Sequence, residues 1–412
     1  MLLDARTVPE GSVLETDLCV VGGGVAGITI ATEAIGRGMR VMLLESGAQS
    51  PHEATQALYD GVVAGRPYYP LRNCRVRQLG GTSAVWGGWC RPLDALDFEE
   101  RAWMPFSGWP FPKEHLDPAY ERAQQLCGLG ENDYGASDWR NDDALTPLMD
   151  SPSFCETLLQ IRATRFGEEF RRRLEAAENV QLLLRANVLS VDMDAVNRTA
   201  QRVHVSTLGG TRFFVRATRF VLAAGGLENP RLLLASRGAN RRGIGNDHDL
   251  VGRFFFDHLH APVARLRDHD GSLRPLHATS TVRGTVVRAA VGLSREAIVN
   301  ERLYGFGVTF HNARDPHDIF SLAQVSESYD ALRYLLKTLA RGERPARAMH
   351  HAAAVVSGLD DIATMAWRKF ATPTDSDLVA GCRAEQAPAR DSRVTLDDSV
   401  DALGAPRVRL DW

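Results

Sequence analysis

The sequence predicts an α/β fold in which a parallel-sheet domain is followed by a second, mixed-sheet (α+β) domain. Three observations support this prediction. The apolar run Leu18–Val21 leads directly into glycines at positions 22, 24 and 27 and then into a helical pattern. A second apolar run, Val41–Leu44, follows that helix. Short β-rich runs between positions 261 and 310 are then followed by two helical patterns, which is typical of a separate mixed domain.

The first glycine cluster has the spacing of a dinucleotide-binding turn. Gly22, Gly24 and Gly27 fit G-x-G-x-x-G between a strand and a helix. Gly22 permits the tight turn, Gly24 leaves room for a pyrophosphate, and Gly27 allows the helix to pack closely on the strand. The helix N-terminus then offers an anion site that needs no Lys or Arg side chain. Gly23 and Ala26 lie in the same turn, so we expect them to contact the cofactor too.

A carboxylate closes the second strand of this predicted Rossmann-like unit. The helix is predicted to run from Ile28 through Ala34 and to end near Gly36, and Glu45 ends the next strand. There it is placed to accept hydrogen bonds from a ribose 2′-hydroxyl. NADP is disfavoured because Glu45 would repel a 2′-phosphate and Ser46 supplies no cation. A turn without a ligand is also disfavoured, because all the parts of the motif occur in order.

Composition indicates a globular protein and excludes several function classes. The 412 residues are 44% hydrophobic and 24% charged, with a formal net charge of -3. This gives no electrostatic basis for binding nucleic acid or an anionic membrane. The longest uncharged stretch, Leu18–Thr32, is too short for a membrane span and contains three consecutive glycines. Residues 1–16 lack an apolar signal core, so we expect a cytoplasmic protein.

The cysteines and histidines form no metal or disulfide motif. The six cysteines are scattered, without a C-x-x-C pair, and are predicted to be reduced thiols. Asp257, His258 and His260 lie close together in sequence, but no third ligand at a plausible spacing supports zinc. We therefore expect hydrogen-bonded, structural histidines and no metal site.

A second glycine-rich segment follows a loop-rich stretch. Glycines occupy positions 80, 81, 87 and 88, with Thr82, Ser83 and Trp86 between them. Such a loop exposes backbone N–H groups to an anion, or brings the main chain against a flat ring system. From these residues alone, a glycine-rich surface turn with Trp86 and Trp89 as core aromatics is an equally good interpretation.

The middle of the chain is predicted to contain helices followed by a meander of antiparallel strands. Helical patterns cover 115–126 and 154–174, and the strands cover 180–184, 188–193, 202–208 and 212–215, with turns at Asn197 and at 209–210. Phe220–Ala223 is predicted to be a buried strand that runs into the small residues Ala224, Gly225 and Gly226. A helix is expected to start at 228–230, where Pro230 suits the first turn. Further helices are expected over 326–340, amphipathic through Leu332, Leu335, Leu336 and Leu339, and over 348–370.

Together these motifs resemble the glucose-methanol-choline (GMC) family of flavoprotein oxidoreductases. The first glycine turn, the segment Leu79–Gly88 and the segment Val221–Leu234 match in order and separation. The segments Asp97–Phe98, Ser107–Phe111 and Val251–His258 are similar to the bacterial sugar and alcohol dehydrogenase branch. The resemblance covers nearly the whole chain.

The resemblance implies that the cofactor is FAD. Its pyrophosphate would lie on the first glycine turn, its flavin side along the 80–88 loop, and its adenine near Val188, with the 224–225 turn near the phosphates. In some relatives a His before the loop tryptophan bonds covalently to the flavin; here that position is Val85, so non-covalent FAD is expected. The predicted cofactor-binding residues are Gly22, Gly23, Gly24, Ala26, Gly27, Glu45, Ser46, Gly80, Gly81, Thr82, Ser83, Trp86, Gly87, Val188, Ala224 and Gly225.

The resemblance also predicts a domain organisation. An FAD-binding domain is expected over residues 12–258, with a helical and loop insertion at about 95–175, and a substrate-binding domain over 259–412. The closing segments 385–396, 401–404 and 407–412 are similar to the last strands of the family's substrate domain.

For function, the resemblance implies oxidation of a sugar, polyol or other alcohol, with hydride transfer to the flavin N5 and oxygen, a quinone or a cytochrome as re-oxidant. Family members continue beyond the point matching Trp412 through a segment that holds a catalytic His and a second His or Asn. We therefore expect a C-terminally truncated chain that is inactive alone, and assign no catalytic residue within it. The alternatives are a catalytically silent flavin-binding protein, half of a split enzyme, or an NAD-binding oxidoreductase.

Overall fold

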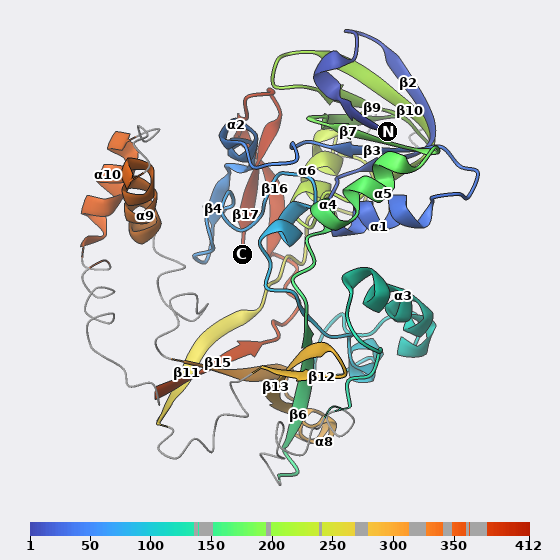
Figure 1. The fold of residues 1–412 in the computed structure, drawn as a ribbon. Helices are drawn as coiled ribbons and strands as arrows, with labels where there is room; N and C mark the ends of the chain where they lie inside the picture. Colours follow the sequence, from blue (N-terminus) through green and yellow to red (C-terminus); the bar gives the residue numbers. More distant parts are fainter. Residues whose placement is uncertain are drawn as a thin grey trace. The chain divides into compact units, whose positions relative to one another are not determined.

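The computed structural model describes residues 1–135, 139, 151–194, 199–238, 241–267, 279–312, 327–340, 348–359, 362 and 377–412. The chain divides into two compact units (Figure 1). Unit 1 comprises Met1–Gly88, Arg162–Phe256 and Pro388–Trp412, and unit 2 comprises Trp89–Ile161 and Asp257–Ala387. The chain therefore crosses between the units several times, whereas the sequence predicted a single boundary near 258 and one insertion.

Unit 1 is built on a seven-stranded sheet of order β1-β7-β3-β2-β10-β9-β8. The five strands from β1 to β10 are mutually parallel, and β9 and β8 continue the sheet antiparallel. Strand bounds in sheet order are Leu2–Asp4, Val180–Leu184, Val41–Glu45, Val13–Val21, Arg212–Leu222, Ala200–Ser206 and Asn187–Met193. In the middle, Cys19 lies opposite Met42 on β3 and Phe220 on β10.

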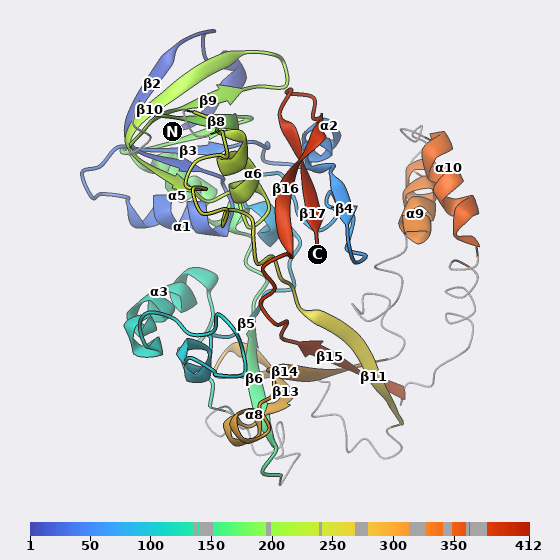
Figure 2. The ribbon, with the colours of Figure 1, turned by 180° about the vertical axis from the view of Figure 1, so that it is seen from behind.

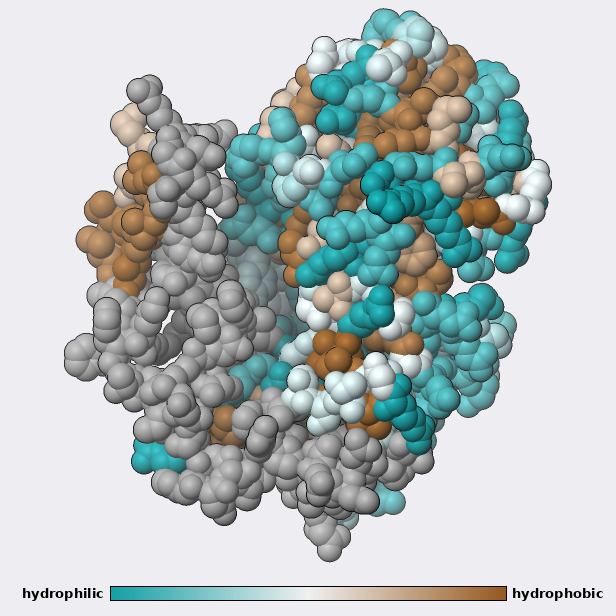
Figure 3. All heavy atoms as spheres, in the orientation of Figure 1, coloured by the Kyte–Doolittle hydropathy of each residue, from teal (hydrophilic) through white to brown (hydrophobic). Residues whose placement is uncertain are grey.

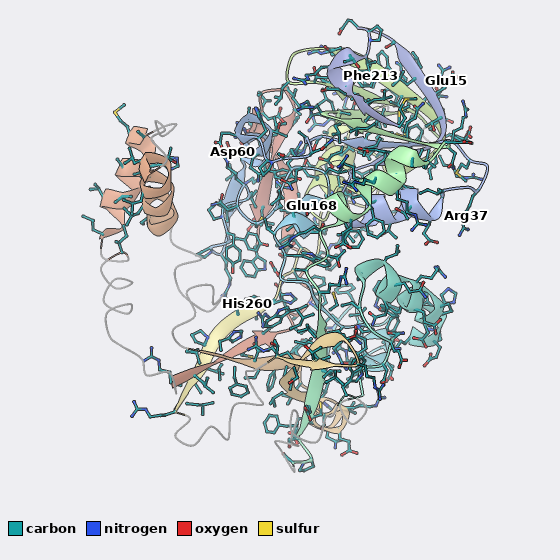
Figure 4. All side chains as sticks on the ribbon, viewed as in Figure 1. Glu15, Arg37, Asp60, Glu168, Phe213 and His260 are labelled. Atoms are coloured by element: carbon teal, nitrogen blue, oxygen red, sulfur yellow. The ribbon has the colours of Figure 1, made fainter. Side chains whose placement is uncertain are left out.

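Both faces of the parallel strands are covered, which explains their continuous apolar runs. Helices α1 (Val25–Glu33) and α5 (Arg171–Ala176) lie beside β3 and β7 on one face (Figure 1). Helix α6 (Glu228–Ala235) packs on β8 (Figure 2), and its Leu232 joins the core on the other face with Cys19, Val21 and Phe213. Phe213, labelled in Figure 4, is fully buried there.

A small second sheet of unit 1 joins two strands near the end of the chain to an early strand, β4. It has the order β16-β17-β4, with bounds Arg393–Val400, Pro406–Asp411 and Val62–Ala64. β17 pairs parallel with β4, and the buried Val408 and Leu410 pack with Leu71 and Leu227. Residues 388–412 thus belong to unit 1 and not to the predicted substrate domain, because their apolar partners lie there.

The remaining described helices of unit 1 are short. They are η1 (Ala5–Thr7), α2 (Glu53–Gln56), η2 (Ala57–Tyr59), η3 (Gly81–Ala84) and α4 (Phe166–Glu169). η3 lies within the second glycine-rich segment, and α4 contacts it.

Unit 2 contains an antiparallel sheet of order β11-β15-β14-β13-β6-β5, with β12 paired to β13. Strand bounds in that order, with β12 last, are Leu259–Arg267, Asp377–Ala384, Phe306–Asn312, Thr285–Leu293, Phe154–Ile161, Trp89–Cys90 and Ser280–Val282. Its described helices are η4 (Ala95–Phe98), η5 (Lys113–His115), α3 (Asp117–Cys127), α8 (Arg295–Asn300), α9 (Glu327–Ala340) and α10 (Ala348–Ser357). A buried cluster of Trp139, Leu158, Val287 and Ala289 covers one face of the sheet.

Several predicted elements differ from the structure. The predicted helix 154–174 was wrong: its first part is strand β6, because Phe154–Ile161 pairs along its whole length with β13, and only α4 and α5 follow. Strand 180–184 is a parallel neighbour of β3 and not part of the meander, and the predicted strands 212–215 and 220–223 are one strand, β10. The predicted turn at Asn197 and the last part of the predicted helix 348–370 lie outside the described residues.

The helical hairpin of unit 2 exposes apolar side chains. Leu336 and Leu339 on α9 and Met349 and Val356 on α10 are all exposed, and Figure 3 shows this apolar surface over the hairpin. α9 is amphipathic as predicted, with Leu332 and Leu335 half-buried. No helix in the described ranges is long and apolar enough to cross a lipid bilayer.

Candidate dinucleotide site

The candidate site is a pocket of about 700 Å³ in unit 1, at the carboxyl ends of three neighbouring parallel strands. β2 ends at Val21–Gly22, β3 at Leu44–Glu45 and β10 at Leu222–Ala223, and all of these residues line the pocket. In open α/β sheets, ligands bind at the carboxyl ends of the strands, where connections leave in opposite directions. The volume is within the range of small-molecule and cofactor sites.

The first glycine turn contains two glycines that are required by packing. Gly22 has φ +108°, and a Cβ added to it would lie 2.6 Å from the carbonyl oxygen of Ala223. A Cβ at Gly27 would lie 1.9 Å from the carbonyl oxygen of Gly22. α1 therefore packs so closely against the turn after β2 that neither position accepts a larger residue.

Gly24 is different, because it faces open space. A Cβ added there meets no atom within 4 Å, and Gly24 lines the pocket. It is the N-cap residue of α1, and the first-turn N–H groups that follow it have no acceptor within the helix. The turn therefore forms a cradle of backbone donors, which fits a phosphate group.

Glu45 joins the first glycine turn to the turn after β3. Its carboxylate accepts hydrogen bonds from the backbone N–H groups of Gly23, at 2.8 Å, and Gly47, at 2.6 Å. The side chain is buried, and burial raises the pKa of Glu45 despite these two donors. Glu45 also lines the pocket beside Ser46. Glu45 therefore stabilises the first glycine turn and the turn after β3. It also lies at the position predicted for a carboxylate that binds ribose.

The second glycine-rich segment packs directly on the first. The N–H of Gly80 donates to the carbonyl of Gly23 at 2.7 Å, and a Cβ at Gly81 would lie 3.1 Å from the Cα of Gly24. Ser83 donates to the carbonyl of Gly80 at 2.6 Å. The indole N–H of Trp86 donates to the carbonyl of Thr164 at 3.0 Å. The segment is therefore a wall of the pocket and not an isolated surface turn.

Most of the predicted cofactor-binding residues come together in this pocket, and four do not. The predicted residues that line it are Gly22, Gly24, Ala26, Glu45, Ser46, Gly81, Thr82, Ser83, Trp86, Val188, Ala224 and Gly225. Gly23, Gly27, Gly80 and Gly87 are not among the lining residues. Gly23, Gly27 and Gly80 instead make the close backbone packing described above.

A buried ion cluster on the pocket wall was not predicted. Glu228 contacts three guanidinium groups: Arg231 at 2.7 Å, Arg75 at 2.8 Å and Arg77 at 3.1 Å. The carboxylate is 5% exposed. Burial alone would raise the pKa of Glu228, but Arg231, Arg77 and Arg75 outweigh it and lower the pKa to about 2. Arg75 and Arg77 also stack on Tyr59, with Cζ 3.9 and 4.2 Å from the ring centroid.

This cluster gives the pocket wall a positive charge. Three guanidiniums share one carboxylate, so two formal positive charges remain, and all four side chains line the pocket. The buried Nε of Arg77 makes no hydrogen bond within the described residues. The negative charge of a pyrophosphate would complement the positive charge of this wall. The predicted anion site at the α1 N-terminus needs no Lys or Arg, and the arginines of the pocket wall are an addition that was not predicted.

The sequence contained a signal for this cluster, but an incomplete one. Arg75 and Arg77 alternate just before the second glycine loop, and Glu228 follows the 224–226 turn. Glu228 lies about 150 positions after the two arginines, and no local sequence feature indicates that these residues pair. The pairing depends on β10 bringing the start of α6 back to the pocket.

The histidine cluster near the start of β11 belongs to unit 2. The backbone N–H of His258 donates to Asp257 at 2.7 Å, and the rings of His258 and His260 stack at 5.5 Å. Within the part of the chain that the structure describes, no group of three or more His, Cys, Asp or Glu side chains is arranged to hold a metal ion.

Comparison with known proteins agrees with a flavin-dependent assignment of the pocket region. A family model described as FAD dependent oxidoreductase matches residues 17–242. Paromamine 6'-oxidase of Streptomyces fradiae is 26% identical over 58% of this chain and 52% of its own length. 2-methyl-1,2-propanediol dehydrogenase of Mycolicibacterium austroafricanum is 24% identical over 66% of this chain and 62% of its own. The large subunit of fructose dehydrogenase of Gluconobacter japonicus is 29% identical over 38% of this chain and 24% of its own. The chain thus spans less than two thirds of each of these relatives.

Solved structures align with nearly the whole chain at low identity. Pyridoxine 4-oxidase from Mesorbium loti aligns with 96% of this chain and 75% of its own, at a TM-score of 0.50 and 18% identity. Formate oxidase from Aspergillus oryzae aligns with 98% of this chain and 78% of its own, at a TM-score of 0.48 and 17% identity. The first of these likenesses supports the mixed α/β fold.

Proposed function

The chain belongs to the FAD dependent oxidoreductase family, and from this membership we propose that it is a GMC-type enzyme that oxidises the hydroxyl group of a sugar, polyol or other alcohol. The observation that carries the proposal is the pocket of unit 1, which is lined both by the open cradle at Gly24 and by a cluster with excess positive charge. The relatives named for fructose and for a propanediol support a hydroxylated substrate.

The chain's own residues suit the parts of FAD. We propose that the N–H groups after Gly24 hold the pyrophosphate, with Arg75 and Arg77 supplying opposite charge. Glu45 would accept from a ribose hydroxyl and Val188 would contact the adenine. FAD, when bound, supplies a two-electron acceptor for the hydride of the alcohol carbon.

We propose that the second glycine-rich segment, which packs against the first turn, borders the flavin side of the cofactor. Gly81, Thr82 and Ser83 line the pocket with a short η3 turn whose backbone is free of large side chains, and Trp86 adds an aromatic wall anchored at Thr164. Val85 is 64% exposed and carries no nucleophile. We therefore propose that FAD is held without a covalent bond at this loop.

The test is to titrate the full 412-residue chain with FAD and with NAD, and to follow flavin fluorescence and heat of binding. We expect saturable FAD binding and none for NAD. FAD should be released intact by acid precipitation, because no covalent bond holds it. Saturable NAD binding without FAD binding would overturn the proposal.

The reaction is tested separately on the FAD-loaded protein. Under anaerobic conditions, a panel of sugars, polyols and simple alcohols is added and the flavin absorption is recorded. Loss of that absorption with a hydroxylated compound supports the oxidoreductase. FAD binding without reduction by any member of a broad alcohol panel would agree with the expectation that this chain is inactive alone, and would leave flavin binding as its own role.

A further inference from the structure

Two cysteines end neighbouring elements of unit 2. Cys90 is the last residue of strand β5, and Cys127 is the last residue of helix α3. Both elements belong to the first stretch of that unit (Figure 2). The two cysteines are free thiols in the structure and are half-buried, so each keeps some contact with solvent.

The sheet register shows how the two elements meet. Cys90 on β5 is paired with Gln160 on β6, and residues directly opposite each other in an antiparallel pair lie on the same face. The fully buried Gln160 side chain accepts from Nε2 of Gln124 on α3 at 3.3 Å and from the N–H of Gly130 at 2.9 Å. The face that carries Cys90 is therefore covered by the end of α3 and the residues that follow it.

Cys127 lies on the part of α3 that makes this contact. Residues three apart on a helix share one side, so Cys127 lies on the same side as Gln124. The hydroxyl of Tyr134 donates to Gln124 at 3.0 Å. Burial raises the pKa of Tyr134 to about 12, and the proximity of Cys90 and Cys127 contributes to the rise. Both cysteines thus lie close to one phenol.

The two thiols contact each other directly. The thiol of Cys90 donates a hydrogen bond to the sulfur of Cys127. This hydrogen bond lowers the pKa of Cys127 against the effect of burial, and it raises the pKa of Cys90 together with burial. Burial also raises the pKa of three other cysteines, Cys19, Cys155 and Cys382. Cys127 is therefore the better nucleophile of the pair.

We propose that Cys90 and Cys127 are a modification site at which hydrogen peroxide forms a reversible disulfide between β5 and α3. A disulfide needs two cysteines whose side chains point towards each other, and the contact between the two thiols meets this requirement. Neither cysteine lines the proposed cofactor pocket. The inference therefore goes beyond the proposed function and needs neither FAD nor turnover.

The oxidation takes place in two balanced steps. The Cys127 thiolate attacks one oxygen of hydrogen peroxide, so an S–O bond forms, the O–O bond breaks, and the released hydroxide takes up a proton to become water. The sulfur of Cys90 then attacks the sulfur of Cys127. An S–S bond forms, the S–O bond breaks, and the leaving hydroxide takes the Cys90 proton as a second water. Two thiols thus lose two electrons and two protons, and one peroxide is reduced to two waters.

The test counts thiols in the full 412-residue chain before and after exposure to hydrogen peroxide. The peroxide is removed, and the protein is alkylated in denaturant and analysed by intact and peptide mass spectrometry. We expect six alkylated cysteines before exposure and four after it, with the peptides of Cys90 and Cys127 joined. Dithiothreitol should restore all six. Absence of the joined peptide after exposure would overturn the inference.

Single variants assign the two roles. In Cys90→Ser, Cys127 should still react with peroxide and be trapped by dimedone as a sulfenic acid. In Cys127→Ser, trapping at Cys90 should be at least tenfold lower, because the pKa of Cys90 is raised. Cys155→Ser is the matched control, since Cys155 is an exposed cysteine of the same unit, and it should leave the disulfide yield unchanged. Equal trapping in the first two variants would contradict Cys127 as the nucleophile.

Oxidation in denaturant tests whether the fold brings the two thiols together, and it needs no variant. In the unfolded chain any two of the six cysteines can pair. We therefore expect the share of disulfides that join Cys90 to Cys127 to be at least threefold higher in the native protein. An equal share in native and unfolded protein would overturn the inference.

Discussion

At the scale of single residues, the glycines at the N-cap and in the first turn of α1, Gly24 and Gly27, have separable roles. A Cβ at Gly27 collides with the Gly22 carbonyl, whereas a Cβ at Gly24 meets nothing in the protein. No neighbouring protein atom therefore requires glycine at position 24, whereas the proposed phosphate of a bound cofactor would. This contrast allows the cofactor assignment to be tested without measuring activity.

We predict that Gly24→Ala leaves the melting temperature nearly unchanged and weakens FAD binding at least tenfold, because the methyl group occupies the cradle. Gly27→Ala should instead destabilise the fold by more than about 1 kcal/mol, since overpacking forces backbone shifts. Thermal melting and FAD titration separate the two effects. Gly209→Ala, remote from the pocket with 3.6 Å to its nearest atom, is the control. Normal FAD affinity in Gly24→Ala would contradict the proposal that the turn at Gly24 binds the pyrophosphate.

A second residue-scale prediction concerns Glu228. Glu228→Gln removes the carboxylate that three arginines share and leaves buried charges uncompensated. Breaking such a buried pair from one side costs about 3–5 kcal/mol. Denaturant unfolding measures the loss. Glu99→Gln, which removes one side of an exposed pair with Arg295, should leave stability nearly unchanged. Equal stability of Glu228→Gln and wild type would show that the cluster is not a structural element.

The same cluster predicts part of the acid sensitivity. The pKa of Glu228 is about 2 in the folded protein against an ordinary value of 4.5. A lowered pKa means that the stabilisation is fully present above about pH 4.5 and is lost as the pH falls towards 2. Wild type should therefore lose stability faster than Glu228→Gln over that interval. Parallel pH profiles of the two proteins would contradict this linkage.

At the scale of elements, β6 and β17 show how pairing partners decide structure. Phe154–Ile161 resembles a helix in its local pattern, yet all of it pairs with β13. β17 lies near the end of a segment predicted to close the substrate domain, yet it pairs with β4 of unit 1. In both cases the hydrogen-bonding partner is distant in sequence, so local propensity could not indicate it.

The place of β17 is testable through one buried side chain. Leu410 is fully buried among Leu71, Val394 and Val408. Leu410→Ala should cost about 2–5 kcal/mol through lost burial and a cavity, and the loss should appear in the unfolding of unit 1, followed by FAD release. Leu336→Ala on α9, where the side chain is 58% exposed, is the control and should change stability by less than about 0.5 kcal/mol. If Leu410→Ala leaves the unfolding of unit 1 unchanged, that result would contradict the pairing of β17 with β4 in unit 1.

At the scale of the whole molecule, each unit is assembled from separate stretches of chain. Unit 1 contains three stretches and unit 2 contains two. The pocket of unit 1 alone draws on residues from Val21 to Phe255. A ligand in this pocket therefore contacts the first and middle stretches of unit 1. Its binding should stabilise both stretches.

We predict that FAD at 100 times its dissociation constant stabilises the native protein by about 2.7 kcal/mol, the value expected from mass action. Hydrogen exchange should slow at residues 22–27 and 80–86 on binding, because these loops line or support the pocket. Exchange in β13 of unit 2 serves as the internal reference. Protection confined to unit 2 would contradict the assignment of the cofactor to unit 1.

The sequence by itself determined the local parts of the site. Strand, glycine turn, helix, strand and carboxylate follow one another within about 30 residues, and the periodicity and glycine spacing that indicate them are local properties. Most of the predicted residues of both glycine loops line one pocket. The first loop follows β2, whose carboxyl end lies at the same edge as those of β3 and β10, and the second loop packs on the first through the hydrogen bond from Gly80 to Gly23.

Only the tertiary structure decided which distant groups meet. The Arg75, Arg77 and Glu228 cluster, the strand β6 and the place of β17 in unit 1 all join residues separated by more than a hundred positions. Such contacts depend on sheet register and on the return path of the chain. No window of neighbouring residues contains that information, because the partners are chosen by burial and hydrogen bonding in the folded state.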